Sequence, residues 1–133
     1  MMAGFPGITH VALTVSDLDR SRAFYDRMFD SVPVLDEDTG SFYHAVYSLE
    51  DGTLFGLHTH PTPNDQPEFR EFRSGLDHVA FGVASRADLE RWVDRLDSLG
   101  FAHGEIVDAP YGSGLSFRDP DNIALEFFAP PSP

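Results

Sequence analysis

Two histidines occupy matching places in two similar stretches of the sequence. Residues 8–15 read ITHVALTV and residues 76–83 read LDHVAFGV, so His10 and His78 are separated by 78 − 10 = 68 residues. A single histidine on a strand is most often a satisfied core or surface residue. Two at equivalent positions of a repeat point instead to one shared centre, and imidazole is the commonest neutral metal ligand. His10 and His78 are therefore predicted to bind one metal ion.

A carboxylate in the last apolar segment is the third candidate ligand. Glu126 lies in IALEFF, residues 123–128. Burying an unpaired carboxylate is costly, so Glu126 must be paired, bound to a metal or turned to solvent. Strand alternation places Glu126 on one face with Ala124 and Phe128. Beside two symmetric histidines, a ligand is favoured over an exposed surface glutamate.

A fourth ligand is expected in the matching strand of the first half, LFGLHTH at residues 54–60. The offset of the histidines gives 126 − 68 = 58, which is His58. Alignment of the turns Asp51-Gly52 and Asp121-Asn122 gives an offset of 70 and places Gly56 opposite Glu126. Positions 56, 58 and 60 share one strand face. We favour His58 over His60, which adjoins a proline-rich segment.

The elements around these residues repeat as well. Each histidine strand precedes an amphipathic helix, the first capped by Ser16 and the second by Ser85 with Asp88 three residues later, and Gly100 ends the second helix. Three strand-like segments then follow each helix. They cover residues 32–35, 42–49 and 53–59 in the first half, and residues 103–107, 115–118 and 123–128 in the second.

This order predicts an α+β protein made of two βαβββ modules. The first module spans residues 7–60 and the second spans residues 75–129, within one structural domain. Residues 61–74 form a connector whose prolines exclude a central strand. Two such half-sheets can curl around a shared concave pocket, where ligands tend to bind.

Composition narrows the possible functions. The chain has 133 residues and carries 22 acidic against 9 basic side chains, a net charge of −13 that disfavours nucleic-acid binding. Its apolar stretches are too short to span a membrane, and the start lacks the features of a secretory signal. Cysteine is absent, so thiolate ligands and thiol nucleophiles are excluded. We expect a cytoplasmic protein.

These features together resemble the vicinal oxygen chelate superfamily, which includes glyoxalase I, bleomycin-resistance proteins, extradiol dioxygenases and methylmalonyl-CoA epimerase. The resemblance covers residues 7–129. Each matching piece is weak alone, but their order and spacing are specific to the superfamily. They are ITHVALTV with the following DLDRS and FY, then GLDHVAF, FRDPDN and LE.

The resemblance implies two βαβββ modules that form an incomplete eight-stranded barrel, or cup, around a divalent metal. Carried over by position, the ligands are His10, His78 and Glu126, with His58 as a less certain fourth. It also implies a homodimer, because many small members build the site at a subunit interface. This sequence departs from the pattern twice. Asn122 stands where the family usually has glycine, and His58 stands where glyoxalase I-like enzymes carry glutamate.

Two histidines and one carboxylate suit several divalent ions. This set is the facial arrangement of non-haem Fe(II) oxygenases, and it also suits Mn²⁺, Ni²⁺, Zn²⁺ or Co²⁺ acting as a Lewis acid. The expected substrate is a small molecule that chelates the ion through two adjacent oxygens. Either dioxygenase chemistry or glyoxalase- or epimerase-like lyase or isomerase chemistry is consistent with this. Glu126 is then the candidate base, and His58 tilts the prediction slightly towards the dioxygenase.

A non-catalytic role is the main alternative. Some superfamily relatives bind aromatic, cationic antibiotics without metal, and the negative charge of this chain would suit such a ligand. Thiol-transfer resistance enzymes are a weaker alternative, because only Arg118 offers itself for phosphonate recognition. Three residues are candidate substrate contacts: Phe42 could stack on a ligand, Tyr111 lies in a glycine-rich loop that could cover the pocket, and Arg118 either pairs with an acidic neighbour or orients a carboxylate.

Overall fold

The computed structural model describes residues 4–63 and 65–132, and Asn64 of the connector lies outside this part. The chain divides between Asp65 and Gln66 into two compact units. Each unit holds one βαβββ module, so the predicted α+β class and the repeat are confirmed. Each module forms its own open four-stranded sheet. The shared eight-stranded cup stays a prediction.

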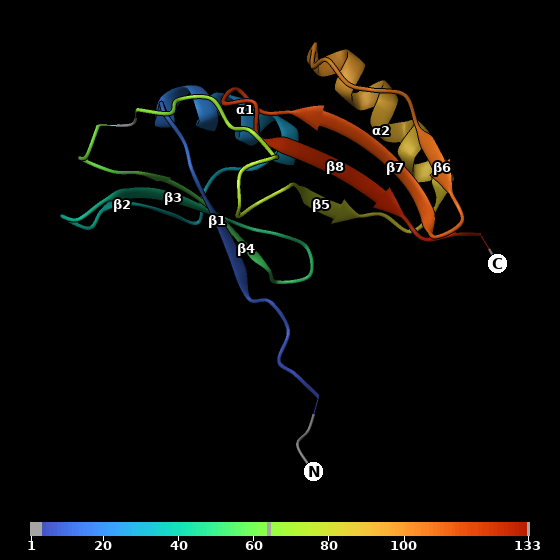
Figure 1. The fold of residues 1–133 in the computed structure, drawn as a ribbon, viewed down its shortest axis with the longest axis horizontal. Helices are drawn as coiled ribbons and strands as arrows, with labels where there is room; N and C mark the ends of the chain where they lie inside the picture. Colours follow the sequence, from blue (N-terminus) through green and yellow to red (C-terminus); the bar gives the residue numbers. More distant parts are fainter. Residues whose placement is uncertain (1–3, 64, 133) are drawn as a thin grey trace. The chain divides into compact units, whose positions relative to one another are not determined.

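The first module places its two terminal strands side by side. The sheet order is β1-β4-β3-β2, with β1 parallel to β4 and the other pairs antiparallel. Figure 1 shows these strands together with their helix. In chain order the elements are β1 (His10–Thr14), α1 (Leu18–Phe29), β2 (Leu35–Asp38), β3 (Tyr43–Ser48) and β4 (Leu54–Thr59).

The second module repeats this topology. Its sheet order is β5-β8-β7-β6, again with the first strand parallel to the last. Helix α2 packs on β7 and β8 (Figure 1). The elements are β5 (Val79–Gly82), α2 (Arg86–Leu99), β6 (Val107–Ala109), β7 (Gly112–Arg118) and β8 (Ala124–Ala129).

Each module buries an aromatic core between its helix and one face of its sheet. In the first, Phe55 of β4 contacts Tyr25 and Phe29 of α1, with ring centroids 5.2 and 5.3 Å apart. In the second, Phe127 of β8 stacks on Trp92 of α2 at 4.0 Å. The candidate metal ligands are therefore expected on the opposite face of each sheet.

The two helices differ in length, and this changes the repeat offset. Helix α1 has 12 residues and α2 has 14, so equivalent residues are 68 apart before the helix and 70 apart after it. The left-handed C-caps show this, because Asp30 ends α1 and Gly100 ends α2. The offset of 70 is therefore the correct one for β4 and β8.

Three local predictions were wrong. Strand β2 begins at Leu35 rather than Val32, because pairing with β3 fixes this edge strand and Pro33 has no N–H to donate. The β6 strand covers Val107–Ala109, and His103 makes only an isolated bridge to Phe117. The N-cap of α1 is Asp17, whose carboxylate accepts from the Arg20 N–H.

Other turn and cap predictions are confirmed. Ser85 and Asp88 form a capping box at α2. Asn122 adopts a left-handed conformation with φ 66°, and Gly52 in the matching turn has φ 89°. In the described part of the chain, neither helix is long and apolar enough to cross a membrane.

Candidate metal site

The candidate ligands lie on the sheet face opposite each helix. In β8, Leu125 and Phe127 are buried in the core, whereas Glu126 between them is only partly covered. The predicted alternation is therefore confirmed. In β4, Phe55 and Leu57 face α1, so Gly56 and His58 share the other face. Each sheet thus presents one face to its core and one face to potential ligands.

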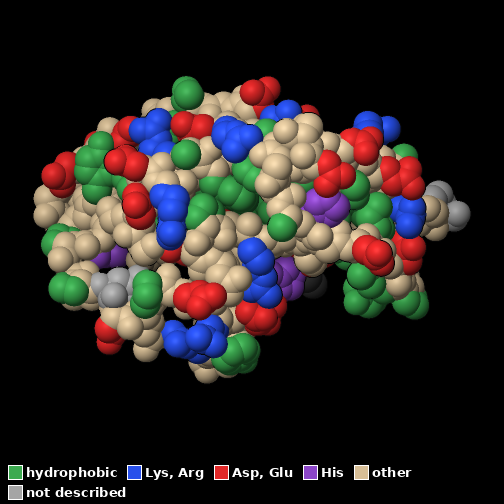
Figure 2. All heavy atoms as spheres, turned by 90° about the horizontal axis from the view of Figure 1, so that it is seen from above, with side chains coloured by type: hydrophobic (Ala, Val, Ile, Leu, Met, Phe, Trp, Pro, Cys, Tyr) green, Lys and Arg blue, Asp and Glu red, His purple; other side chains and the backbone are tan. Residues whose placement is uncertain are grey.

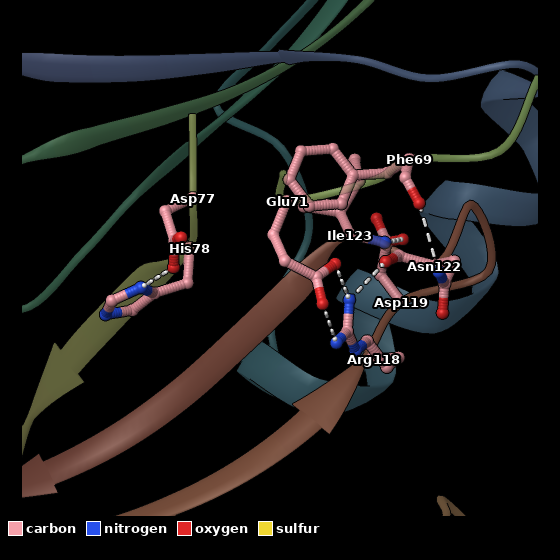
Figure 3. A network of polar contacts seen from close by, with 8 residues as sticks. All are labelled: Phe69, Glu71, Asp77, His78, Arg118, Asp119, Asn122 and Ile123. Atoms are coloured by element: carbon pink, nitrogen blue, oxygen red, sulfur yellow. Dashed lines mark hydrogen bonds and ion pairs between the residues drawn. The ribbon is translucent and has the colours of Figure 1, made fainter. Parts of the chain in front are cut away.

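In the second module, His78 and Glu126 lie close together. Nε2 of His78 is 3.9 Å from Oε2 of Glu126. Nδ1–H of His78 donates to Oδ1 of Asp77 at 2.7 Å, which leaves the Nε2 lone pair available (Figure 3). Donors that share an ion about 2 Å away lie roughly 3–4 Å apart. This geometry fits two ligands of one ion, oriented by an outer carboxylate.

In the first module, His10 is held in a similar way. Its Nδ1 forms a 2.9 Å hydrogen bond with Oγ1 of Thr9, the residue before it. Nε2 is again the nitrogen left for a ligand. Both histidines are thus oriented through Nδ1 by the preceding side chain, an arrangement that recurs at metal-binding histidines.

A glycine makes room for the Glu126 carboxylate. A Cβ added to Gly114 of β7 would lie 2.8 Å from Oε1 of Glu126. Any side chain there would displace the carboxylate. The glycine-rich segment that contains Tyr111 was predicted to be a loop, but its glycines Gly112 and Gly114 lie in strand β7 (Gly112–Arg118). The close approach of Glu126 explains why glycine is needed.

His58 lies among other imidazoles and a phenyl ring. Its ring stacks on Phe42 with centroids 4.8 Å apart and meets His44 edge-on at 5.1 Å. Burial is the main cause that lowers the pKa of His58, followed by the neighbouring His44, His60 and His10. The neutral imidazole, which is the form that binds metal, is therefore favoured.

The other predicted contact residues have structural partners. Tyr111 lies at the tip of the β6–β7 turn, 74% exposed, with its ring stacked near Phe128 at 6.4 Å. Both guanidinium N–H groups of Arg118 donate to the Glu71 carboxylate, at 3.0 and 3.1 Å. This ion pair lowers the pKa of Glu71 to about 2.

Two hydrogen bonds next to this ion pair hold the connector against the β7–β8 turn. Nδ2 of Asn122 donates to the Phe69 carbonyl at 3.0 Å, and the Phe69 N–H donates to the Asp121 carbonyl at 2.8 Å. Figure 3 shows Glu71 and Phe69 on the connector facing Arg118 and Asn122. These contacts fix the segment that leads into His78.

The ligands within one module do not complete a site. Among the described residues, no three histidine or acidic side chains form a metal-binding cluster. The predicted set divides by sequence, with His10 and His58 in the first module and His78 and Glu126 in the second. The His78–Glu126 pair is thus one half of the proposed ligand set.

Asp77, Thr9 and Glu71 were not predicted from the sequence. Asp77 and Thr9 directly precede the candidate histidines, and that position was the available signal. Glu71 gave none, because its partner Arg118 is 47 residues away.

Comparisons with known proteins identify the family of this chain. The model of the Glyoxalase/Bleomycin resistance protein/Dioxygenase superfamily matches residues 7–127. The chain belongs to this superfamily. It is also called the vicinal oxygen chelate superfamily, so the resemblance seen in the sequence is confirmed.

Individual relatives include named enzymes. The metallothiol transferase FosB of Shouchella clausii is 30% identical over 129 residues, covering 90% of this chain and 77% of that protein. The putative ring-cleaving dioxygenase MhqA of Bacillus subtilis is 35% identical over 63 residues, 47% of this chain and 20% of that protein.

A solved structure of a glyoxylase/bleomycin resistance protein/dioxygenase domain from Frankia sp. EAN1pec is also similar. It is 35% identical with a TM-score of 0.85, covering 97% of this chain and 95% of that one.

Proposed function

We propose that this protein is a divalent-metal-dependent enzyme whose small-molecule substrate binds the metal through two adjacent oxygens. The observation that carries the proposal is the His78–Glu126 pair, with Nε2 and Oε2 3.9 Å apart and Nδ1 of His78 held by Asp77. The similar Thr9–His10 contact supports it. Relatives named as a metallothiol transferase and a ring-cleaving dioxygenase support it as well.

The proposed ligands are His10, His78 and Glu126, with His58 as the fourth. Two imidazoles and a carboxylate fit Fe, Ni, Zn, Mn or Co as divalent ions. When bound, such an ion would act as a Lewis acid on the paired oxygens of the substrate. Glu126 is the proposed base for proton transfer beside a carbonyl. The substrate is thereby oriented by the two oxygens that it presents to the site.

The arginines argue against a phosphonate as the substrate. All nine basic residues are arginines, and Arg118 is the one arginine in a described strand. Its two donor groups are bound by Glu71. Figure 2 shows arginine side chains interspersed with carboxylates over the visible face. A substrate that needs no arginine, such as a catechol or a hydroxy-carbonyl compound, fits this site better.

We also propose that the enzyme is cytoplasmic and acts as a homodimer. The proposal rests on the superfamily resemblance, in which small members form the site at a subunit interface. Within its own sheet β1 is an edge strand, and its outer N–H and C=O groups can pair with a second copy.

Metal binding tests the proposal directly. Protein purified without a metal-affinity tag is analysed for metal, then titrated with Zn²⁺, Ni²⁺, Mn²⁺ and Fe²⁺ under anaerobic conditions. We expect about one ion per chain, lost in His78→Ala and Glu126→Ala but retained in His103→Ala. His103 is a suitable control because its imidazole bonds to Asp97 and to the Gly104 carbonyl instead.

The loaded enzyme then separates the reaction classes. Oxygen uptake with catechols indicates a dioxygenase, whereas proton exchange or isomerisation of a hydroxy-carbonyl compound indicates a lyase or isomerase. Glu126→Gln should abolish the second activity. If no divalent ion binds to the wild type, the proposal is wrong and a metal-free ligand-binding protein becomes the better account.

A further inference from the structure

The ion pair between Arg118 and Glu71 lies on the sheet face that carries the candidate ligands of the second module. In β7 the residue opposite Glu126 is Ser116, and Arg118 follows two positions later. Residues two apart on a strand share a face, so Arg118 and Glu126 project from the same side of the sheet. All of them lie within one compact unit, Gln66–Pro133.

The connector leads from this ion pair to His78 through an exposed segment. Of residues 66–77, only Phe69 and Glu71 are partly covered, and the others are exposed. Phe69 is bonded to the β7–β8 turn, and Glu71 is bonded to Arg118. Glu71 is therefore the last partly covered residue of the connector before His78.

The Glu71 carboxylate holds both ends of the Arg118 guanidinium (Figure 3). Nη1–H donates to Oε2 at 3.0 Å, and Nη2–H donates to Oε1 at 3.1 Å. Nη1–H also donates to the carbonyl of Asn122 at 3.1 Å. Paired bonds of this kind fix the plane and direction of a guanidinium. Because a partly exposed ion pair contributes little to folding stability, its main effect is to orient Arg118.

A second carboxylate, that of Asp77, also acts on Arg118. The bonds to Glu71 raise the pKa of Arg118, and the negative charge of Asp77 adds to this effect. In the view of Figure 3, Glu71 lies between Arg118 and the Asp77–His78 pair. Asp77 accepts the bond from Nδ1 of His78 at 2.7 Å and is itself exposed. A guanidinium without Glu71 would therefore compete with His78 for Asp77.

We propose that Glu71 is a positioning residue for the candidate metal site, because it holds Arg118 and so keeps Asp77 available to orient His78. This inference rests on the proposed function, in which His78 is a ligand. The bond that Nδ1 makes decides which ring nitrogen carries the proton, and so decides whether the Nε2 lone pair is free. Glu71 thus acts on the ligand through Arg118 and Asp77.

Ni²⁺ affinity of the full chain is the first quantity to measure, by chelator competition. We expect Glu71→Ala to weaken binding roughly 10-fold, as loss of an outer partner of a metal-bound histidine does. Adding Arg118→Gln removes the competing guanidinium, so the double variant should recover most of the lost affinity. Glu90→Ala is the matched control, because it removes the same charge from an ion pair with Arg86 on α2 and should leave the affinity unchanged.

An epistasis test shows whether Glu71 acts through Asp77. In an Asp77→Ala background the bond to His78 is already lost, so Glu71→Ala should weaken Ni²⁺ binding no further. Two residues that act independently would instead give additive losses.

The tautomer of His78 provides a measurement that needs no metal. In protein with ¹⁵N-labelled histidine at alkaline pH, the His78 proton should reside on Nδ1, which donates to Asp77. Glu71→Ala should move it towards Nε2, and the double variant with Arg118→Gln should return it to Nδ1. A purely structural ion pair would change the urea unfolding midpoint and leave the tautomer as it is.

The outcomes separate the two proposals. If the wild type binds no divalent ion, the proposed function fails, and the tautomer of His78 still decides whether Glu71 orients it. If His78→Ala abolishes Ni²⁺ binding while Glu71→Ala changes neither affinity nor tautomer, the inference is overturned and the function stands. A loss in Glu71→Ala that Arg118→Gln does not restore also overturns it, because Glu71 would then act through the fold of the connector. Recovery of both affinity and tautomer in the double variant supports it.

Discussion

The two modules share one topology but place polar and apolar side chains differently at equivalent positions. The residues that pair side by side across the four strands of a sheet form one row. The row of the first sheet that contains His58 is Thr14, His58, His44 and Glu37. The equivalent row of the second sheet is Gly82, Phe128, Gly114 and Val107. In the neighbouring row, closer to the candidate histidines, the second sheet has the polar side chain instead. The first sheet has Gly56 there, whereas the second has Glu126.

This difference shows how a repeated fold can hold an asymmetric site. Backbone pairing is the same in both sheets, so the strands provide equivalent positions rather than equivalent ligands. In each sheet a glycine admits the polar side chain: Gly56 lies under His58, and Gly114 lies under Glu126. The proposed second donor is thus a nitrogen in the first module and an oxygen in the second. The four predictions below test how far the modules differ, from the largest expected effect to the smallest.

The largest effect should come from the aromatic cores. Phe55→Ala in the first module and Phe127→Ala in the second each remove a buried ring, at a cost of about 3–5 kcal/mol in unfolding free energy. The single tryptophan, Trp92, packs on Phe127 and reports on the second module. Urea unfolding is followed by Trp92 fluorescence and by far-UV circular dichroism.

The Phe55→Ala variant shows whether the modules unfold together. If they form one structural domain, loss of Phe55 lowers the Trp92 transition midpoint as well. Phe127→Ala provides the reference shift for a direct change in the second core. A Trp92 midpoint unmoved by Phe55→Ala would mean that the modules unfold independently, contrary to the prediction of one domain.

The residues before the two histidines should contribute unequally to metal affinity. Asp77 accepts a charge-assisted bond from His78, whereas Thr9 makes a neutral one with His10. We expect Asp77→Ala to weaken Ni²⁺ binding roughly 10- to 100-fold and Thr9→Ala to weaken it less. Calorimetric titration measures both. Asp97→Ala, which removes the partner of His103, is the control, and equal losses in all three variants would contradict the prediction.

The matching turns should differ in stability because only one of them holds the connector. Asn122 and Gly52 both adopt left-handed conformations at equivalent positions. Asn122→Gly removes the bond to the Phe69 carbonyl and should cost about 1 kcal/mol. Asn122→Ala adds backbone strain and should cost about 2 kcal/mol, whereas Gly52→Ala costs the strain alone. Thermal unfolding compares the three, and an Asn122→Gly variant as stable as the wild type would exclude a role for the hydrogen bond between Asn122 and the Phe69 carbonyl.

Sequence periodicity was sufficient for the repeat, the helices and the strands that face a core. The capping box at Ser85 and the alternation around Glu126 followed from local chemistry. Edge strand β2 did not, because hydrogen bonds to β3 rather than its own apolar residues decide where it begins. Its exposed Val32 and Val34 made an earlier start plausible.

The candidate site was predictable only in part. The repeat suggested His10 and His78 as ligands and the apolar strand suggested Glu126, but the residue of the first module equivalent to Glu126 was ambiguous. The two additional residues of α2 change the offset from 68 to 70, and sequence alone did not locate them in the helix. The fold of the His58 ring over Gly56 depends on packing against Phe42 and His44, which no sequence pattern indicates.

The smallest effect should be a pH dependence confined to the second module. His103 is bonded through both nitrogens, with Nδ1 to the Gly104 carbonyl and Nε2 to Asp97, each at 2.7 Å. Both bonds require a donated proton, and the Gly104 bond followed by that to Asp97 raises the pKa of His103. The first module has Pro33 at the equivalent position, so it has no such group.

A raised pKa in the folded state gives a stability contribution with a definite sign. The contribution is fully present below the unfolded value of about 6.5 and disappears as pH rises through the higher folded pKa. Unfolding free energies of the wild type and His103→Gln are therefore compared from pH 5.5 to pH 8.5. We expect the difference to be largest at the acidic end and to shrink above pH 6.5. Because the subtraction cancels the other histidines, a difference that stays constant with pH would mean that folding does not raise the pKa of His103.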